Sequence, residues 1–548
     1  QYYAQRYSMT DDFPFAEINV FQLGLYAQDK WTVSDKLNLT LGLRIDVPFF
    51  MTDLQSNDKV AAETYRDGIK IDVSKYPNAK PQFSPRFGFN YKPFDDENGS
   101  LQIRGGTGLF TGTPPYVWIS NQAGNNGVLF GDLNVRAVKD KNDNIISDGR
   151  PSLGFTGNMD TYKPAEGSAT RSDIAITDPD FKYPSLWKSN IAADYKFGDG
   201  WVATVELLYS KDINAIYHDN IGLYRTEQFV NDGGAGNARP YYNGYYSDRE
   251  GNQKAANHVV MLRNTSKGHS LYTTFQLQKN FVDGILKGLY LNGSYSFGQS
   301  RGVTDGTSSV ATSAWKYRAA LDGNAEEVGY TAGSFDGRLL LSASYTANWS
   351  KYAATSFGLI YQRYRPFRYS YCYNGDANGD SQFSNDLMYI PANFDEVKDH
   401  LLPGDFDSQE DAWKAMNAFI EQDPYLSKHR GEYAERNGAV APFANQLDLS
   451  VSHDIKIYQK NGRSHTLRFS FNIANFLNLL NRNWGVVQTT VLGNQQYQFL
   501  TIPKGQGPSA ANNYTLKYTM AKDLDETFKD NLNDVSRWQM QFGIKYIF

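Results

Sequence analysis

Apolar and polar side chains alternate with a period of two in many separate segments of this chain. Side chains on a β-strand point to opposite faces in turn, so each such segment has one apolar face and one wet face. The pattern recurs in segments that begin near residues 21, 37, 87, 101, 187, 203, 271, 289, 339, 357, 447, 467 and 538. In the last of them, the apolar parity holds Trp538, Met540, Phe542, Ile544, Tyr546 and Phe548. The chain is therefore predicted to be all-β, with about thirteen amphipathic strands.

Short and long connections alternate strictly between these segments. Turns of a few residues, such as Ser34–Lys36 and Gly198–Gly200, separate the members of each pair. Connections of about 30 to 70 residues separate the pairs, which is rare in globular β proteins. Outer-membrane barrels have this arrangement, with short periplasmic turns and long extracellular loops. The polar parity carries Arg, Gln, Asn, Ser and Thr in strand after strand, as a wide, wet lumen requires. The pattern predicts a transmembrane antiparallel β-barrel.

Composition agrees with a barrel and excludes other classes. Aromatic residues make up 15% of the chain, with 38 Tyr and 33 Phe, which fits the aromatic girdles of membrane barrels. No apolar run approaches the roughly 18 residues that a spanning helix needs. The net charge of −5 indicates no nucleic-acid partner. The lone Cys372 forms no internal disulfide, and the seven His show no metal-ligand spacing, so no enzymatic activity is predicted.

The direction of the strands sets an expectation for the two ends of the chain. The last connection is long, so Phe548 is expected at the periplasmic end. Counting back, the first strand runs the same way, and residues 1–20 are expected to be an extracellular loop remnant. Two strands that run in the same direction cannot close a barrel antiparallel, and lipid does not tolerate an open edge. Residues 21–548 are therefore expected to be the C-terminal part of a barrel whose other strands lie outside this chain.

Several motifs carry a family resemblance. The segment YAQDKWTVSDKLNLTLGLRIDVP (26–48) resembles a mid-barrel hairpin of TonB-dependent outer-membrane receptors. The segments SPRFGFNY (84–91), NDLMYIP (385–391) and FSFNIANFLNLLNRNWG (469–485) resemble the Oar-like branch, which is typical of Bacteroidetes and myxobacteria. The resemblance implies a barrel of about 22 strands filled by an N-terminal plug. The plug and the domain before it are absent from this chain.

The resemblance also implies a location, a function and partners. It implies the bacterial outer membrane, with lipid and lipopolysaccharide around the barrel, and active uptake of an unidentified peptide, protein, glycan or chelate. TonB–ExbB–ExbD would act through the absent plug, and the barrel assembly machinery would recognise the terminal aromatic Phe548. The alternative is a structural or docking barrel of an envelope or secretion complex, with a surface lipoprotein or another envelope component as its partner.

One loop has partial calcium-binding spacing. Asp376, Asn378 and Asp380 occupy positions 1, 3 and 5 of an EF-hand-like loop, and Gln382 occupies position 7. Position 12 is Leu387 rather than Glu, so the full motif fails unless Asp386 substitutes for it. A calcium site is one interpretation. A plain turn, in which Asp and Asn side chains cap their own backbone, is the other.

Other candidate residues lie in the long connections. Aromatic side chains there are candidates for stacking on a substrate at the barrel mouth, or for holding the loops together; they are Tyr116, Trp118, Tyr241, Tyr242, Tyr245 and Tyr246. Arg363, Arg365 and Arg368 form a basic stripe that would bind an anion or pair with loop carboxylates. Residues 407–421 have the spacing of a short amphipathic helix packed on the loops.

Overall fold

The computed structural model describes residues 2–9, 16–97, 99–136, 138–139, 145–146, 158, 172–234, 236, 238–458, 464–493 and 495–548. Within them, thirteen long strands follow one another in one antiparallel sheet, and the short β18 (Gly329–Tyr330) pairs with the end of one of them. The long strands are β2 (Val20–Ser34), β3 (Leu37–Phe50), β4 (Gln82–Asp96), β5 (Gly99–Thr111), β10 (Ser185–Phe197), β11 (Trp201–Asp212), β16 (Gly268–Asn280), β17 (Leu289–Gly302), β19 (Arg338–Ser350), β20 (Ala353–Tyr364), β26 (Ala444–Tyr458), β27 (Ser464–Ala474) and β32 (Gln539–Ile547). The prediction of an all-β chain is confirmed.

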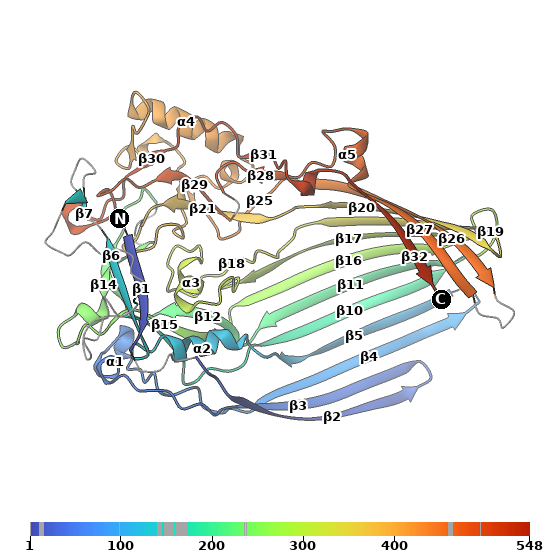
Figure 1. The fold of residues 1–548 in the computed structure, drawn as a ribbon, viewed down its shortest axis with the longest axis horizontal. Helices are drawn as coiled ribbons and strands as arrows, with labels where there is room; N and C mark the ends of the chain where they lie inside the picture. The colour runs from blue at the N-terminus through green and yellow to red at the C-terminus, as the bar shows by residue number, and fades with distance from the viewer. Residues whose placement is uncertain are drawn as a thin grey trace.

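The sheet has two different ends. Short turns join β2 to β3, β10 to β11 and β16 to β17 at one end, on the right of Figure 1. Long connections join β11 to β16 and β20 to β26 at the other end, on the left, where they fold into further elements. The predicted alternation of short and long connections is therefore confirmed.

One face of the sheet is apolar from strand to strand. Val205, Phe275 and Tyr295 are direct neighbours across β11, β16 and β17. All three side chains are exposed, Phe275 to 47%. The register therefore places the apolar residues of successive strands side by side, and a one-residue slip would move them to the other face. A continuous exposed apolar face is what a bilayer requires of a barrel.

The opposite face carries polar pairs. Arg104 and Asp194 form an ion pair of 2.9 Å between β5 and β10, and Arg468 and Asp454 form one of 2.6 Å between β27 and β26. Gln276 donates to Asn292 across β16 and β17 at 2.8 Å. These side chains remain partly exposed, so this face borders water, as the predicted lumen does.

The sheet has two edge strands that run in the same direction. β2 leads into a short turn, and β32 follows a long connection, so both run towards the short-turn end. Among the described residues, each pairs with a strand on one side only. Both strands are exposed on both faces along most of their length. The prediction that the first and last strands share a direction is confirmed.

The long connections pack together, and we call their described residues the loop assembly. It holds three main sheets: β12 (Ala215–Asn220), β15 (Ala256–Thr265) and β9 (Ser172–Thr177); β13 (Leu223–Phe229) and β14 (Pro240–Tyr245); and β23 (Leu401–Leu402), β30 (Tyr518–Met520), β29 (Gln496–Thr501), β21 (Arg368–Asn374) and β25 (Ala439–Val440). Smaller two-stranded sheets are β22 (Tyr389–Ile390) with β24 (Glu432–Tyr433), β28 (Gln488–Thr490) with β31 (Phe528–Asp530), and β7 (Val138–Lys139) with β8 (Ile145–Ile146). The helices are α1 (Asp58–Ala62), α2 (Tyr116–Gly124), α3 (Ala311–Lys316), α4 (Gln409–Gln422) and α5 (Phe476–Leu480).

The loop assembly has a hydrophobic core of its own. Residues of three different connections meet in it, among them Val230, Tyr371 and Phe499. Helix α4 covers this core, with Met416 and Phe419 buried, and Ser408 caps its first turn by accepting from the backbone N–H of Asp411. The predicted amphipathic helix on the loops is therefore confirmed. Among the described residues, no helix is long and apolar enough to cross a bilayer.

The N-terminal residues also lie in the loop assembly. Strand β1 (Tyr2–Ser8) pairs antiparallel with β6 (Phe130–Arg136), in the connection between β5 and β10. The prediction of loop throughout residues 1–20 is therefore wrong for Tyr2–Ser8. The partner strand lies far away in sequence and leaves no local signal.

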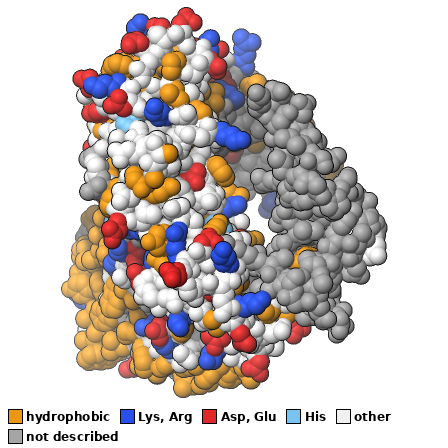
Figure 2. All heavy atoms as spheres, turned by 90° about the vertical axis from the view of Figure 1, so that its left-hand side faces the viewer, with side chains coloured by type: hydrophobic (Ala, Val, Ile, Leu, Met, Phe, Trp, Pro, Cys, Tyr) orange, Lys and Arg blue, Asp and Glu red, His pale blue; other side chains and the backbone are white. Residues whose placement is uncertain are grey.

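Figure 2 views the loop end, where charged side chains of both signs are scattered over the centre and hydrophobic ones gather along the lower left margin.

Candidate functional site

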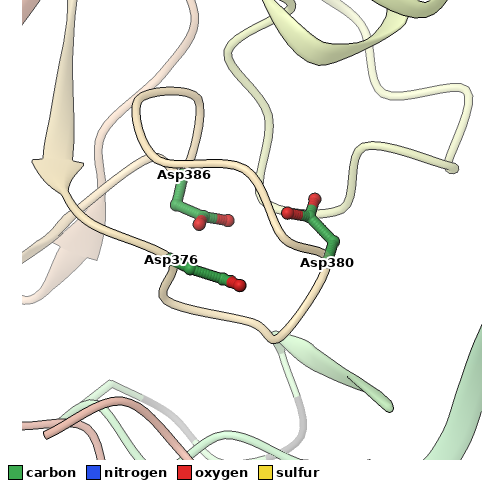
Figure 3. A group of neighbouring side chains, drawn as sticks. All are labelled: Asp376, Asp380 and Asp386. Carbon is green, nitrogen blue, oxygen red and sulfur yellow. The ribbon is translucent and has the colours of Figure 1, made fainter. Parts of the chain in front are cut away.

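The calcium-like loop brings three carboxylates together. Oxygens of Asp376, Asp380 and Asp386 all lie within 4.8 Å of one another (Figure 3). Asp380 and Asp386 are each 1% exposed. Calcium–oxygen bonds of about 2.3–2.6 Å let two oxygens up to about 5 Å apart share one ion. The spacing of the three groups therefore fits a single calcium ion. Asp386 would take the role of the Glu that the sequence lacks at position 12.

The start of this loop is shaped by its own hydrogen bonds. The carboxylate of Asp376 accepts from the backbone N–H groups of Gly379 (2.6 Å) and Ser381 (2.8 Å). Gly379 has a φ of 83°, and a Cβ there would overlap the carbonyl oxygen of Tyr242. Glycine is needed here both for the left-handed conformation and for this close approach.

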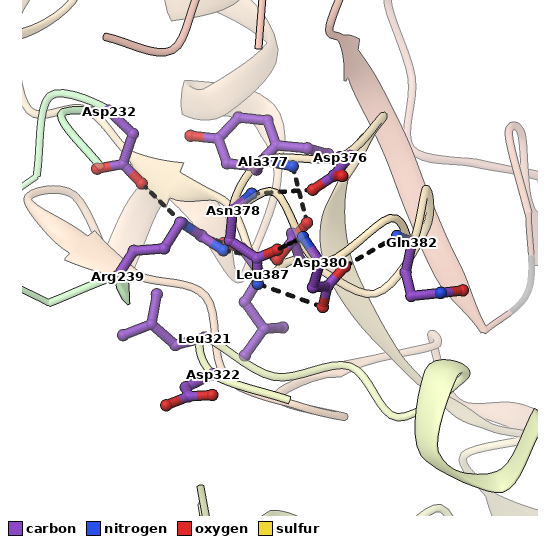
Figure 4. A network of polar contacts seen from close by, with 12 residues as sticks. Asp232, Arg239, Leu321, Asp322, Asp376, Ala377, Asn378, Asp380, Gln382 and Leu387 are labelled. Atoms are coloured by element: carbon purple, nitrogen blue, oxygen red, sulfur yellow. Dashed lines mark hydrogen bonds and ion pairs between the residues drawn. The ribbon is translucent and has the colours of Figure 1, made fainter. Parts of the chain in front are cut away.

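The other two predicted ligands have different roles. The side-chain oxygen of Asn378 accepts from the N–H of Asp380 at 2.9 Å, so Asn378 braces the turn. Gln382 donates its backbone N–H to Asp380 at 2.8 Å, and its side chain extends away from the carboxylates in Figure 4. The structure thus groups Asp376, Asp380 and Asp386, and it leaves the side chain of Gln382 outside the group.

A buried arginine offsets part of the charge. Arg239 is 0% exposed and pairs with Asp386 (3.0 Å) and Asp232 (3.2 Å), and it also donates to the carbonyl oxygen of Leu387 (Figure 4). One guanidinium therefore pairs with Asp232 and Asp386, while Asp376 and Asp380 add two further carboxylates to the same group. Sequence patterns did not indicate Arg239 or Asp232, because both reach the acidic loop from another connection.

Burial raises the pKa values of the three acids, and neighbouring carboxylates raise two of them further. Burial raises the pKa of Asp386 to about 7, against the lowering effect of Arg239. Burial also raises the pKa of Asp376, and burial together with the neighbouring carboxylates Asp386 and Asp376 raises the pKa of Asp380 well above its usual range. Buried carboxylates that repel each other need protons or a cation to offset their charge. Calcium would supply that positive charge.

The acidic loop joins separate connections of the loop assembly. The N–H of Tyr242 in β14 donates to the carbonyl oxygen of Asn378 at 2.7 Å. The N–H of Ala320 donates to the carbonyl oxygen of Asn385 at 2.9 Å, and Leu387 donates back to Ala320 at 3.2 Å. A cation bound by the cluster would therefore strengthen the contact between three long connections.

Removal of calcium gives a direct prediction. If the cluster holds Ca²⁺, a chelator should make the loop assembly more sensitive to protease, because saturation at 100 times the dissociation constant adds about 2.7 kcal/mol of stability. Asp380→Asn should abolish this calcium dependence, whereas Asp395→Asn, at an exposed acid of the same connection, should keep it. Equal cleavage rates with and without chelator in the unsubstituted protein would contradict calcium binding.

The six candidate aromatic residues do not form one cluster. Tyr116 and Trp118 lie on α2, where the hydroxyl of Tyr116 is 3.0 Å from that of Tyr183 and the indole N–H of Trp118 donates to Ser308 at 2.8 Å. Both pack against the same small core within the loop assembly. Their position in packed contacts fits the interpretation that they hold loops together.

The four tyrosines near β14 pack in different places. Tyr241 packs its ring 5.1 Å from that of Tyr514, and Tyr242 is buried and donates to Asp322 at 2.7 Å. Tyr245 packs against the same small cluster that holds Tyr242, and Tyr246 packs against another one. A substrate-stacking role of these residues stays a prediction.

The arginine stripe and the C-terminus have clear positions. Arg365 and Arg368 both pair with Asp336, at 3.3 and 3.6 Å, and Arg363 lies over the ring of Phe443 at 4.5 Å. Two of the three arginines thus pair with a loop carboxylate, as the second interpretation predicts, and binding of an external anion by the stripe stays a prediction. Phe548 follows β32 at the short-turn end and is 91% exposed, and its role as an assembly signal stays a prediction.

We expect the loop assembly to lose stability at low pH because it contains a buried histidine. His218 in β12 is 4% exposed, its Nε2 has no partner among the described residues, and burial lowers its pKa to about 4. Because the unfolded value is near 6.5, its neutral form stabilises the fold above pH 6.5, and about 3 kcal/mol is lost as the pH falls to 4. His218→Phe should flatten the stability of the loops between pH 7 and 4.5, measured by near-ultraviolet circular dichroism. His429→Phe, at a partly exposed position, should not, and equal behaviour of the two variants would contradict the assignment.

The sheet and its two faces define the class of the protein. A continuous antiparallel sheet with an exposed apolar face, a polar opposite face, and short and long connections at opposite ends is an outer-membrane β-barrel sheet. The sequence profile of the outer membrane beta barrel domain family matches residues 3–514. The chain belongs to this family, and its location is the outer membrane. None of the curated proteins compared with the chain matches it.

The solved structures that match this chain include a receptor and two transporters. The siderophore receptor PirA from Acinetobacter baumannii is 8% identical with a TM-score of 0.39, over 84% of this chain and 42% of that chain. The copper transporter OprC is 9% identical with a TM-score of 0.37, over 84% and 43%. The FrpB iron transporter from Neisseria meningitidis is 11% identical with a TM-score of 0.36, over 84% and 42%. The chain spans less than half the length of each of these proteins.

Proposed function

We propose that the chain forms part of the barrel of a TonB-dependent outer-membrane transporter of the Oar-like branch. The observation that carries the proposal is the polar face of the sheet, with its ion pairs and amide contacts in successive strands. Barrels of about eight strands fill their interior with side chains, whereas wider ones enclose a channel or a plug. A sheet of thirteen strands therefore belongs to a barrel with a wide lumen. A plug would keep a lumen of this width from leaking, and an active transporter moves that plug.

The second part of the proposal concerns the two edge strands of the sheet. β2 and β32 run in the same direction, so they cannot pair antiparallel with each other. The open hydrogen-bonding groups of both edges need partners in a bilayer. We propose that further strands of the same protein complete the barrel, and that a plug domain connects it to TonB. The motifs at residues 26–48, 84–91 and 385–391 support this assignment.

Uptake measurements test the proposed function. Deletion of the gene should abolish uptake of one substrate class among peptides, proteins, glycans and metal chelates, and a protonophore should abolish the same uptake in the parent strain. The proton gradient is required because the inner membrane energises TonB. Uptake that persists in the deletion strain for every class, or that ignores the protonophore, would contradict the proposal.

A docking barrel is the second candidate, and the loop assembly favours it. The loops share a buried core that holds Tyr371, Phe419 and Phe499, and such a core makes their outer surface a stable platform for a protein partner. A docking barrel should co-purify with an envelope protein or surface lipoprotein in fixed proportion. Its deletion should leave uptake intact, so the same strain separates the two candidates.

A further inference from the structure

A pocket of about 390 Å³ lies where three long connections meet, and we call it the arginine pocket. Its wall combines residues around α3, the start of β21, and residues 436–437 and 495–496. Three arginines lie in this wall: Arg318, Arg368 and Arg436, which are 5%, 8% and 3% exposed. The pocket is separate from the acidic cluster, whose carboxylates do not line it.

Two of these arginines form no close ion pair within the described part of the chain. Among the described residues, no acidic oxygen lies within 4.0 Å of the side chain of Arg318 or Arg436. Arg318 donates to the carbonyl oxygen of Gly323, and Arg436 donates to that of Val303. The Nε of each is buried and has no acceptor in the described part of the chain. Both buried guanidinium groups therefore donate to backbone carbonyls, and the described carboxylates that offset their charge, Glu327 among them, act from beyond ion-pair distance.

The third arginine and the local acids leave the wall positive. Arg368 is 3.6 Å from Asp336, and it also donates to the carbonyl oxygen of Ser334 at 2.8 Å. Within the wall the only acidic residue is Asp305, which accepts from Asn437 and from the N–H of Ala332. Burial lowers the pKa of all three arginines, although nearby carboxylates such as Glu327 and Asp336 act in the opposite direction. Buried charges of this kind need a counter-charge.

The rest of the wall indicates what kind of anion fits. Ser370, Asn437 and Gln496 offer polar atoms, whereas Tyr317 and Phe367 form an apolar part. The volume falls within the range of about 300–1,000 Å³ for small-molecule sites. A bare inorganic ion would leave the apolar part uncovered, and Asp305 would repel a second negative charge.

We propose that the arginine pocket binds a carboxylate that carries an apolar body, as in a small organic acid or the C-terminus of a peptide. Arginine matches a carboxylate with two parallel N–H donors, so the guanidinium groups would hold the anion and the aromatic wall would hold the body. The inference does not depend on transport, because binding is measured on the purified protein whether or not uptake occurs.

Equilibrium dialysis on the full-length protein in detergent tests the proposal. N-acetyl-phenylalanine should bind, and its neutral amide should bind at least about 10-fold more weakly, since a charged hydrogen bond is lost. Benzoate as a second probe distinguishes the two sources of the carboxylate: tighter binding of benzoate indicates an organic acid, and tighter binding of the acetylated amino acid indicates a peptide terminus. Equal affinity for acid and amide, or tighter binding of inorganic phosphate than of either acid, would overturn the proposal.

Two variants locate the binding in the pocket. Arg436→Gln should weaken binding of N-acetyl-phenylalanine at least about 10-fold. Because Arg436 also holds backbone carbonyls, Thr307→Glu provides an independent variant: Thr307 is an exposed wall residue, and the added carboxylate should weaken binding similarly without removing a structural contact. Arg430→Gln, in the same connection but outside the pocket wall, should bind like the parent. Unchanged binding in Thr307→Glu would refute the location.

Discussion

The variant Phe275→Arg is expected to accumulate poorly in the outer membrane. Phe275 lies near the middle of β16 on the apolar face, between Val205 and Tyr295 of the neighbouring strands. An arginine facing lipid near the bilayer midplane costs about 2–4 kcal/mol. The folded fraction is measured by heat-modifiable migration of outer-membrane protein on gels, and the loss of stability by unfolding in urea.

The adjacent residue provides the matched control. Gln276 points to the opposite face and donates to Asn292. Gln276→Arg adds the same side chain one position away, so it should assemble at nearly the level of the parent protein. If both variants assemble equally, or if Gln276→Arg is the more damaging, the assignment of the two faces to lipid and lumen is wrong.

The variant Arg239→Met should loosen the loop assembly while the barrel strands stay folded. Arg239 is the only cation that pairs with Asp232 and Asp386 among the described residues, and all three side chains are at most 1% exposed. Removing one partner of a buried ion pair costs about 3–5 kcal/mol. Protease sensitivity of a locally opening region follows its free energy of opening, so cleavage of the loops should accelerate by about 100-fold or more.

A second arginine of the loops separates this effect from a general loss of charge. Arg430 pairs with Glu421 at 3.8 Å, and that carboxylate is largely exposed. Because exposed ion pairs contribute about 0–1 kcal/mol, Arg430→Met should leave cleavage nearly unchanged. Equal cleavage of the two variants would contradict a structural role for the buried pair. Heat-modifiable migration should stay normal in both.

The strands could be predicted because the sequence signals that define them lie within each segment. Alternation along residues 538–548 and the short turn at 198–200 depend on neighbours in sequence, and they gave the face, the order and the direction of the strands. Helix α4 was predictable for the same reason, since Ser408 and the spacing of Met416 and Phe419 lie within one segment.

The loop assembly could be predicted only in part because its contacts join distant segments. The spacing of Asp376, Asn378 and Asp380 indicates a calcium-like turn that lacks Glu at position 12, with Asp386 as its substitute. The structure groups Asp386 with Asp376 and Asp380. Arg239 and Arg436 reach their sites from other connections, and no local pattern distinguishes them from surface arginines. The aromatic residues were visible as a set, but their distribution over separate clusters depends on tertiary packing.

Cysteine labelling on intact cells tests the central claim, that short turns face the periplasm and long connections face the outside. Cys372 is the only cysteine of the chain and is fully buried, so it should not react in the folded protein. Asp283→Cys places a thiol in the exposed turn between β16 and β17, and Asp399→Cys places one on the exposed surface of the loops. A membrane-impermeant maleimide should label Asp399→Cys on intact cells, and Asp283→Cys only after the outer membrane is permeabilised. Labelling of Asp283→Cys on intact cells, with Asp399→Cys protected, would contradict the account.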